Sequence, residues 1–479
     1  MNYRIIAYIL GWILNFEALF MAVPAFTALY YSEGAGIGFV FSLLICLFFG
    51  VILTLKKPAK KALYSRDGLV IVSLSWIVLS LFGALPFYVT GVIPSFIDAV
   101  FESAAGFTTT GASILSEVES LPRCILMWRS FTHWIGGMGV LVFIMAFVPL
   151  SGGQNMYIMK AESPGPSVSK LVPKVKTTAL LLYSMYFILT LAEFVFLLCG
   201  GMSVFESLNT ALSTAGTGGF GFRNNSFESF SPYIQWVVTV FMFLFGVNFS
   251  IYFLILSKRI KEAMKSTELR VYILLVVAVT ALITVNVSDM FATLGDAVRN
   301  VAFTVVSLVT TTGFATVDFN KWPELSRSII VILLFTGACA GSTCGGIKLS
   351  RIIMLFKSMS KELRLLVHPK QVHQIKIDGR VVSHETVRSV NVFLVCYMLI
   401  MMISFILISF DNHDLITNFT AVSATLNNVG PGLGLVGPTS NYGFFSGFSK
   451  LVLIFDMIAG RLELFPMLAL FSPYTWKDK

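Results

Sequence analysis

The sequence predicts an all-α polytopic membrane protein, made of four pseudo-repeated helix–loop–helix units around a central axis and a two-helix N-terminal extension. The first observation is composition: 56% of the 479 residues are hydrophobic and only 12% are charged, with a mean hydropathy of +0.82. A soluble protein carries about 25% charged residues. The second is that apolar runs long enough to cross a bilayer recur from end to end. The third is a set of four shorter segments that resemble one another.

Ten apolar runs are predicted to span the membrane. They are residues 3–31, 37–55, 68–92, 125–149, 178–200, 233–257, 269–287, 327–356, 388–410 and 448–472. Lys and Arg gather in four of the intervening segments: Lys56–Arg66, Lys160–Lys176, Lys258–Arg270 and Lys357–Arg388. Basic clusters stay on the cytoplasmic side of a membrane, so both termini are predicted to be cytoplasmic. The net charge of +9 then follows from topology and does not indicate a nucleic-acid partner.

Four segments between the spans are too short to cross the membrane. They are residues 95–108, 203–216, 293–310 and 414–427. Each follows an outward-going span, precedes an inward-going one and closes on a turn of small polar residues, which predicts a helix that enters the membrane and leaves on the same side. Such backbone is tolerated where it is buried in protein or lines water. An amphipathic helix at the interface is the alternative for any one of them, but four in the same place favour the re-entrant arrangement.

The four turns align on one glycine each. These are Gly111, Gly219, Gly313 and Gly430, the last after one inserted residue. Their spacing of roughly 100 residues is too long for a solenoid repeat and fits a repeated unit of two spans and a loop. The chain is therefore predicted to divide into an N-terminal extension (1–67) and four repeats: 68–176, 177–268, 269–387, which carries a gate loop and a cytoplasmic loop, and 388–479.

Four such loops around one axis can present rings of backbone carbonyl oxygens to a dehydrated cation. Glycine accepts the angles that turn carbonyls inward, and the short helices point their negative C-terminal ends at the same axis. Acids in the first turns are predicted to cap these helices and to make the outer mouth negative: Asp98, Glu102, Glu206, Asp296 and Asp414. The pattern predicts a central cation pore lined by four pore loops.

Seven motifs in order along the chain resemble the TrkH/TrkG/KtrB superfamily of potassium-translocating subunits, most closely its TrkH/TrkG branch. They are "TTTGAS" from Thr108, "HWIGGMGVLVF" from His133, "TTTGFAT" from Thr310, "GACAGSTCGGIK" from Gly337, "ELRLLVHPKQV" from Glu362, "ATLNNVGPGLG" from Ala424 and "AGRLELF" from Ala459. The resemblance implies potassium uptake across the bacterial inner membrane and a homodimer in membrane lipid. It also implies a cytosolic TrkA-like ring of nucleotide-binding regulatory subunits, with no nucleotide bound by this chain.

The resemblance also implies which residues form the potassium filter. They are Thr109, Thr110 and Gly111; Thr217, Gly218 and Gly219; Thr311, Thr312 and Gly313; and Asn428, Val429 and Gly430. Potassium would bind their backbone carbonyls. Plant relatives that prefer sodium carry serine at the first filter glycine, so Gly111 favours potassium. Several neighbouring glycines leave the register of the second loop open by one or two residues.

Glycines interrupt the apolar run 327–356, where they make a poor helix interior. Close helix packing through small residues is one interpretation. The other, which the resemblance also implies, is a broken helix whose loop obstructs the path below the filter. This gate would consist of Gly337, Gly341, Ser342, Thr343, Gly345, Gly346 and Lys348, together with Arg461. Arg461 would act as an electrostatic brake; the alternative is a structural ion pair with Asp456 or Glu463.

The longest cytoplasmic loop covers residues 357–388. Alternation around Asp378–Gly379 predicts a β-hairpin. With Lys361, Arg364 and Lys370, this loop is the expected docking surface for a regulator.

Two other classes of function compete with a gated pore. An enzyme needs a convergent set of nucleophile, base or metal ligands, and the five histidines show no catalytic spacing, so the chain is not expected to be an enzyme. A proton- or sodium-coupled cation symporter with the same filter stays open. Carriers often show two inverted halves and an intramembrane carboxylate, whereas here the units are parallel and the acids are predicted to lie at the mouths.

Overall fold

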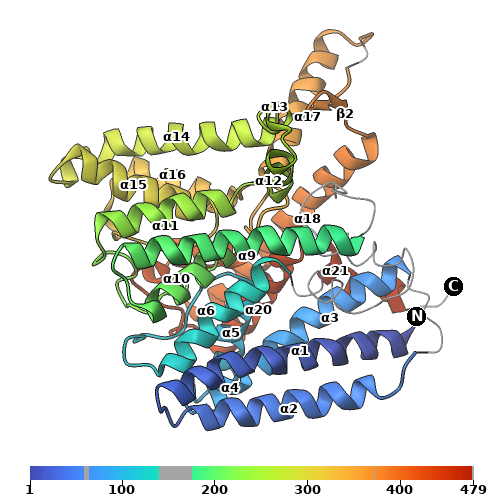
Figure 1. Cartoon of the computed structure of the whole chain (residues 1–479). Helices are drawn as coiled ribbons and strands as arrows, with labels where there is room; N and C mark the ends of the chain where they lie inside the picture. Colours follow the sequence, from blue (N-terminus) through green and yellow to red (C-terminus); the bar gives the residue numbers. More distant parts are fainter. Residues whose placement is uncertain (59–63, 140–174, 372, 477–479) are drawn as a thin grey trace.

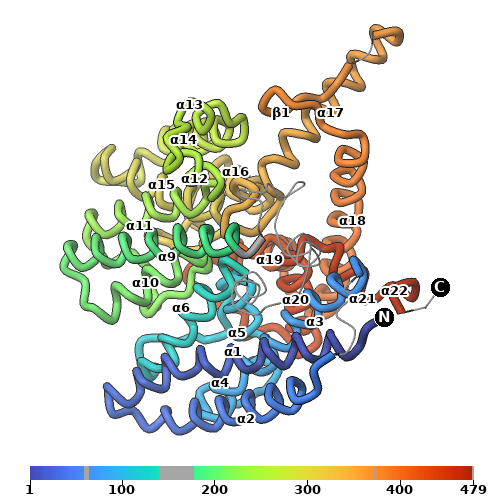
Figure 2. Tube along the Cα trace, turned by 45° about the vertical axis from the view of Figure 1, so that its right-hand side comes forward, coloured from blue at the N-terminus to red at the C-terminus, as the bar shows by residue number. Residues whose placement is uncertain are grey.

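The computed structural model describes residues 1–58, 64–139, 175–371 and 373–476, and it is mostly helical (Figure 1). Helices α1 (Tyr3–Tyr30) and α2 (Gly36–Thr54) pack against each other along one edge, as Figure 2 also shows. These two helices cover most of the segment 1–67 that was predicted to be a separate extension.

After this extension the order long helix, short helix, return helix occurs four times. The sets are α3 (Ser65–Gly83) with α4 (Leu85–Val89), α5 (Phe96–Phe107) and α6 (Arg123–Gly137); α9 (Val175–Cys199), α10 (Val204–Gly216) and α11 (Pro232–Phe245) with α12 (Phe249–Leu256); α14 (Thr267–Val287), α15 (Leu294–Val309) and α16 (Glu324–Phe335) with α17 (Leu349–Val367); and α18 (His384–Ile408), α19 (Leu415–Leu426) and α20 (Gly447–Arg461) with α21 (Phe465–Phe471). Short connecting helices are α13 (Ile260–Ala263), α22 (Pro473–Trp476), η1 (Ser288–Met290), η2 (Phe319–Lys321), η3 (Ser409–Asp411) and η4 (Gly434–Val436).

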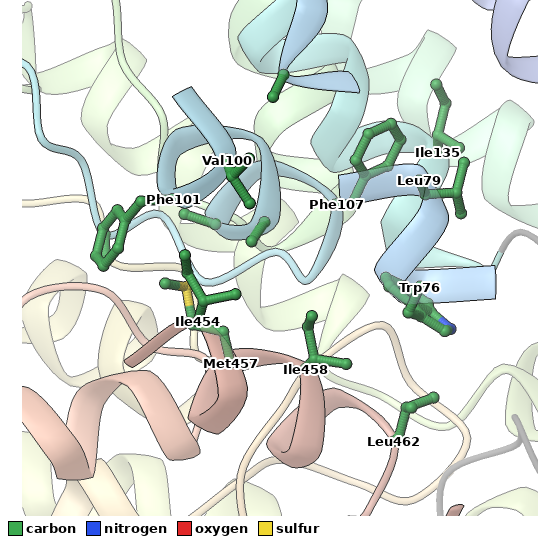
Figure 3. Packing of buried hydrophobic residues seen from close by; sticks show 14 of the residues in the cluster. Trp76, Leu79, Val100, Phe101, Phe107, Ile135, Ile454, Met457, Ile458 and Leu462 are labelled. Atoms are coloured by element: carbon green, nitrogen blue, oxygen red, sulfur yellow. The ribbon is translucent and has the colours of Figure 1, made fainter. Parts of the chain in front are cut away.

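The short helices α5, α10, α15 and α19 coincide with the four segments predicted to be re-entrant. Each begins at a polar cap whose side chain accepts an N–H from three residues on: Ser95, Ser203, Thr293 and Asp414. Hydrogen bonds from Thr417 hold the pKa of the Asp414 carboxyl below its usual range. The second half of each helix is buried. Figure 3 shows Val100 and Phe101 of α5 facing Ile454 and Met457 of α20. Burial in protein is the condition for such segments at membrane depth.

Within the described residues, six unbroken helices are long and apolar enough to cross a membrane, and α11 with α12 makes a seventh if the bent pair counts as one. The span predicted over 233–257 is sharply bent, because α11 and α12 meet at 90°. Another segment occupies the break: the N–H of Cys339 donates to the Gly246 carbonyl, and the N–H of Phe249 donates to the Gly341 carbonyl, both at 3.1 Å.

The other three predicted spans are interrupted or leave the described part of the chain. Helix α6 ends at Gly137, and residues 140–149 of the predicted span 125–149 lie outside the described residues. The run 327–356 is split between α16 and α17, as predicted. The run 448–472 is split after Arg461, where Glu463 and Leu464 have φ of 53° and 67°.

The β-hairpin predicted around Asp378–Gly379 is confirmed. Strand β1 (Lys376–Ile377) pairs antiparallel with β2 (Arg380–Val381), and both turn residues, Asp378 and Gly379, have positive φ. Figures 1 and 2 show α17 and this hairpin, in orange, projecting from the rest of the bundle.

Candidate functional site: a ring of four loops above a broken helix

The four short helices end in the same turn. Its first residue is left-handed in every loop, with φ between 53° and 55°: Thr109, Thr217, Thr311 and Asn428. The N–H that follows donates to the carbonyl five positions back, as from Thr110 to Ala105 at 2.9 Å. Glycine normally makes this helix ending. A β-branched threonine is strained there, so surrounding contacts must hold it, as happens at functional sites.

A second left-handed residue follows two positions later in each loop: Gly111, Gly219, Gly313 and Gly430. A Cβ atom on Gly111 would overlap the carbonyl oxygen of Gly218 in the next loop. The same overlap recurs around the molecule, for Gly219 with Thr312, Gly313 with Val429 and Gly430 with Thr110. The loops therefore form a closed ring in chain order, backbone against backbone. The matching angles also give the second loop the register Thr217, Gly218, Gly219.

The segments that leave the ring on its outer side are tied to one another in the same order. The Val118 N–H donates to the Asn224 side chain at 2.9 Å, which joins the first unit to the second. The Phe227 N–H donates to the Ala315 carbonyl at 2.9 Å, joining the second to the third. The Gly434 N–H donates to Asn320 at 3.1 Å, and the Tyr442 N–H donates to the Ser113 carbonyl at 2.8 Å. These last two bonds join the third unit to the fourth and the fourth to the first.

His133 on α6 lies behind the second loop. The Phe220 N–H donates to its Nε2 at 3.2 Å, so the ring proton is on Nδ1, which lies 2.7 Å from the Gly106 carbonyl and donates to it. A Cβ atom on Gly218 would overlap this ring. His133 therefore connects the end of α5 to the second loop, a role that the sequence did not reveal.

Glu102 does not lie at the mouth, and that prediction is wrong for this residue. It is fully buried and pairs with Arg129 of α6 at 2.8 Å. It also accepts the Ile114 N–H at 3.0 Å, while Arg129 donates to the Gly221 carbonyl at 3.0 Å. The pair therefore fixes the exits of the first two loops. Asp98 also has a cationic partner, Lys450, at 2.6 Å.

The chain between α16 and α17 forms a loop against the ring, where the gate was predicted. The Gly345 N–H donates to the Thr311 hydroxyl at 2.7 Å. A Cβ atom on Gly345 would meet the Asn427 carbonyl oxygen, so this approach requires glycine. The loop closes on itself through the Gly337 N–H, which donates to the Ile347 carbonyl at 2.9 Å. Lys348 donates to the carbonyls of Cys344 and Gly345 within the same loop.

Arg461 joins this loop to the ring and to α6. Its guanidinium donates to the Thr343 carbonyl at 2.8 Å and to the Thr109 hydroxyl at 3.3 Å. It also donates to the carbonyls of Gly136 and Gly137, at the negative end of α6. The two carboxylates considered as its structural partners have other contacts, since Glu463 pairs with Arg351 and Asp456 accepts a hydrogen bond from Ser404.

Glu268, in the first turn of α14, holds both ends of the interrupted region. Its Oε1 accepts the Ala340 N–H at 2.8 Å and the Ser350 N–H at 3.1 Å. Acidic residues are common in the first turn of a helix, so the sequence around Glu268 gives no sign of these two distant contacts.

Two cavities adjoin the ring and the loop, and we call them outer and inner by the orientation that the sequence predicts. The outer one is lined by all four left-handed glycines, Gly111, Gly219, Gly313 and Gly430. The inner one is lined by loop residues Gly341, Ser342, Gly345, Gly346 and Lys348, and by Arg461. None of the described residues lines both cavities.

Helices α1, α9 and α20 each carry a buried carboxylate. These carboxylates are Glu17 on α1, Glu193 on α9 and Asp456 on α20, each at most 1% exposed. Such groups are expensive inside a membrane and usually functional.

Comparisons with known proteins agree on one family. A family model described as TrkH, cation transport protein, matches residues 37–477. The chain is 36% identical to the Trk system potassium uptake protein TrkH of Escherichia coli (strain K12), over 100% of both chains. It is 33% identical to the Trk system potassium uptake protein TrkG of the same organism, over 99% of each. The crystal structure of the potassium transporter TrkH from Vibrio parahaemolyticus superposes with a TM-score of 0.90, at 33% identity over 100% of both chains.

Proposed function

The chain belongs to the TrkH family of cation transport proteins, and on that basis we propose that it takes up potassium across the bacterial inner membrane. It is a transporter and not an enzyme, and potassium is its transported substrate. The pathway runs through the ring of four loops. The observation that carries this proposal is the closed contact of each left-handed glycine with a carbonyl of the next loop, since a ring of backbone carbonyls can replace the hydration shell of a cation.

The loop between α16 and α17 acts as the gate, with Arg461. Its contacts support this role, because Gly345 and Arg461 each bind a hydroxyl at the first filter position, on Thr311 and Thr109. Transport requires this loop to leave the ring. The positive charge of Arg461 adds a repulsion of roughly 2 kcal/mol for a potassium ion about 8 Å away at an effective dielectric of 20.

The protein works as a homodimer with cytoplasmic termini, under the control of a TrkA-like cytosolic ring that binds nucleotide. The projecting helix α17 and the β1–β2 hairpin support this assignment, because α17 begins one residue after the gate and continues to the proposed docking surface. A partner that moves α17 can therefore move the gate loop directly.

A proton- or sodium-coupled symporter with the same filter is the second candidate. The buried carboxylates Glu17, Glu193 and Asp456 favour it, because intramembrane acids are common in ion-coupled carriers. Potassium flux into liposomes against its own gradient, measured with and without a proton or sodium gradient, separates the two. Uphill flux that requires the second gradient would establish coupling, and purely downhill flux would establish a gated pore.

A further inference from the structure

Tyr442 lies between α19 and α20, buried beside the outer end of the ring. Its N–H donates to the Ser113 carbonyl at 2.8 Å, and its ring packs 5.8 Å, centroid to centroid, from Phe101. Both contacts are with the first unit, although Tyr442 belongs to the fourth. Its position is therefore fixed by two units at once.

The hydroxyl of Tyr442 donates a hydrogen bond of 2.6 Å to the carbonyl oxygen of Gly430. Gly430 is the outermost filter residue of the fourth loop. Within the described part of the chain, the matching carbonyls of Gly111, Gly219 and Gly313 accept no hydrogen bond from a side chain. The ring is therefore unequal at its outer end, with one carbonyl held by a donor behind it.

The geometry points to Tyr442 as a positioning residue that sets the ion selectivity of the outermost site, an inference that rests on the proposed pore. A carbonyl oxygen has two acceptor positions, so Gly430 can bind the hydroxyl and a cation together. The hydroxyl fixes the direction of this carbonyl. Discrimination between potassium and sodium depends on the number, reach and field strength of the coordinating carbonyls. A Gly430 carbonyl released from Tyr442 can close on a smaller ion.

The test is Tyr442→Phe in the full-length protein in liposomes, with potassium and sodium flux measured per folded protein. The variant keeps the ring and its packing against Phe101. The potassium-to-sodium flux ratio should fall by about fivefold, the scale of one hydrogen bond. The matched control is Tyr397→Phe, since the buried Tyr397 hydroxyl accepts from the Asn427 side chain at 2.6 Å and, among the described residues, donates to no filter carbonyl. This control should keep the wild-type ratio.

A second readout does not depend on flux. Potassium and sodium should each raise the melting temperature of the detergent-purified protein according to their affinity, and Tyr442→Phe should narrow the difference between the two ions. The assignment would be overturned if Tyr442→Phe kept both the wild-type flux ratio and the wild-type difference in melting temperature between the two ions. It would also be overturned if Tyr397→Phe changed these quantities as much as Tyr442→Phe does. Gly111→Ser serves as the reference. If only Gly111→Ser alters selectivity, the filter stands and the role of Tyr442 falls; if neither does, the filter itself falls.

Discussion

The N–H of Gly345 donates a 2.7 Å hydrogen bond to the hydroxyl of Thr311, which places the interrupted helix in direct contact with the ring. Across the ring, Arg461 binds the equivalent hydroxyl of Thr109. In the proposed pore these hydroxyls are ligands for the innermost cation. A gate at this loop would therefore do more than obstruct the proposed path, because it would also occupy two of the oxygen atoms that a cation would use.

Replacement of Arg461 by alanine should speed potassium flux by about tenfold or more, since charge-assisted hydrogen bonds that hold the gate closed are lost. Selectivity should change little, because the filter carbonyls are untouched. Flux per folded protein in liposomes is the measurement. Arg259→Ala, at an exposed arginine paired with Glu262, is the control and should leave flux unchanged. Slower flux, or loss of folded protein, would show that Arg461 is structural.

Glu268→Ala should also raise basal potassium flux, by about tenfold, since two backbone N–H groups lose a charged acceptor. Glu268→Gln should stay close to wild type in flux, because glutamine keeps the Oε1 acceptor for Ala340 and Ser350. Glu262→Ala removes an exposed carboxylate nearby and serves as the control. If Glu268→Ala folded normally and had the same flux as wild type, Glu268 would not be the residue that holds the loop closed.

Gly111→Ser should relax the preference for potassium over sodium, because its side chain would overlap the Gly218 carbonyl. Gly91→Ser is the control for backbone strain, because Gly91 has a φ of 74°, close to that of Gly111. The space around Gly91 is open, so its serine would cause the strain without the overlap. The ratio of the two fluxes in liposomes should change only in the first variant. An unchanged ratio in well-folded Gly111→Ser would count against the four-loop filter.

ATP or NADH should affect transport only when a separate cytosolic subunit is present. The reason is that, in the proposed assembly, the nucleotide site belongs to the partner and this chain would supply only the docking surface on α17 and the hairpin. Flux from the purified chain alone, with and without nucleotide, is the first arm, and the same assay with an added TrkA-like subunit is the second. If nucleotide changed flux through the purified chain alone, the prediction that a separate subunit binds the nucleotide would be wrong.

Local signals made the short helices predictable from the sequence. Asp414 and Ser203 are caps, and the glycines at Gly111 and Gly313 mark turns, so these elements depend on residues close in the chain. The bend between α11 and α12 was missed because it depends on Cys339 and Gly341, which lie far along the sequence. Glu102 was predicted at the outer mouth for the same reason, since its partner Arg129 belongs to another helix.

The ring closes between its two ends in the sequence: the side chain of Asn428 donates to the hydroxyl of Thr110 at 2.9 Å, across 318 residues. The first loop is synthesised long before Asn428 in the fourth loop. Until the fourth loop is made, the polar groups of the first loop lack this partner. Unpaired polar backbone is costly in lipid. Premature termination upstream of the fourth loop would leave that cost unrelieved and mark the fragment for membrane proteases. The ring is thus expected to be complete only when the fourth loop has been synthesised.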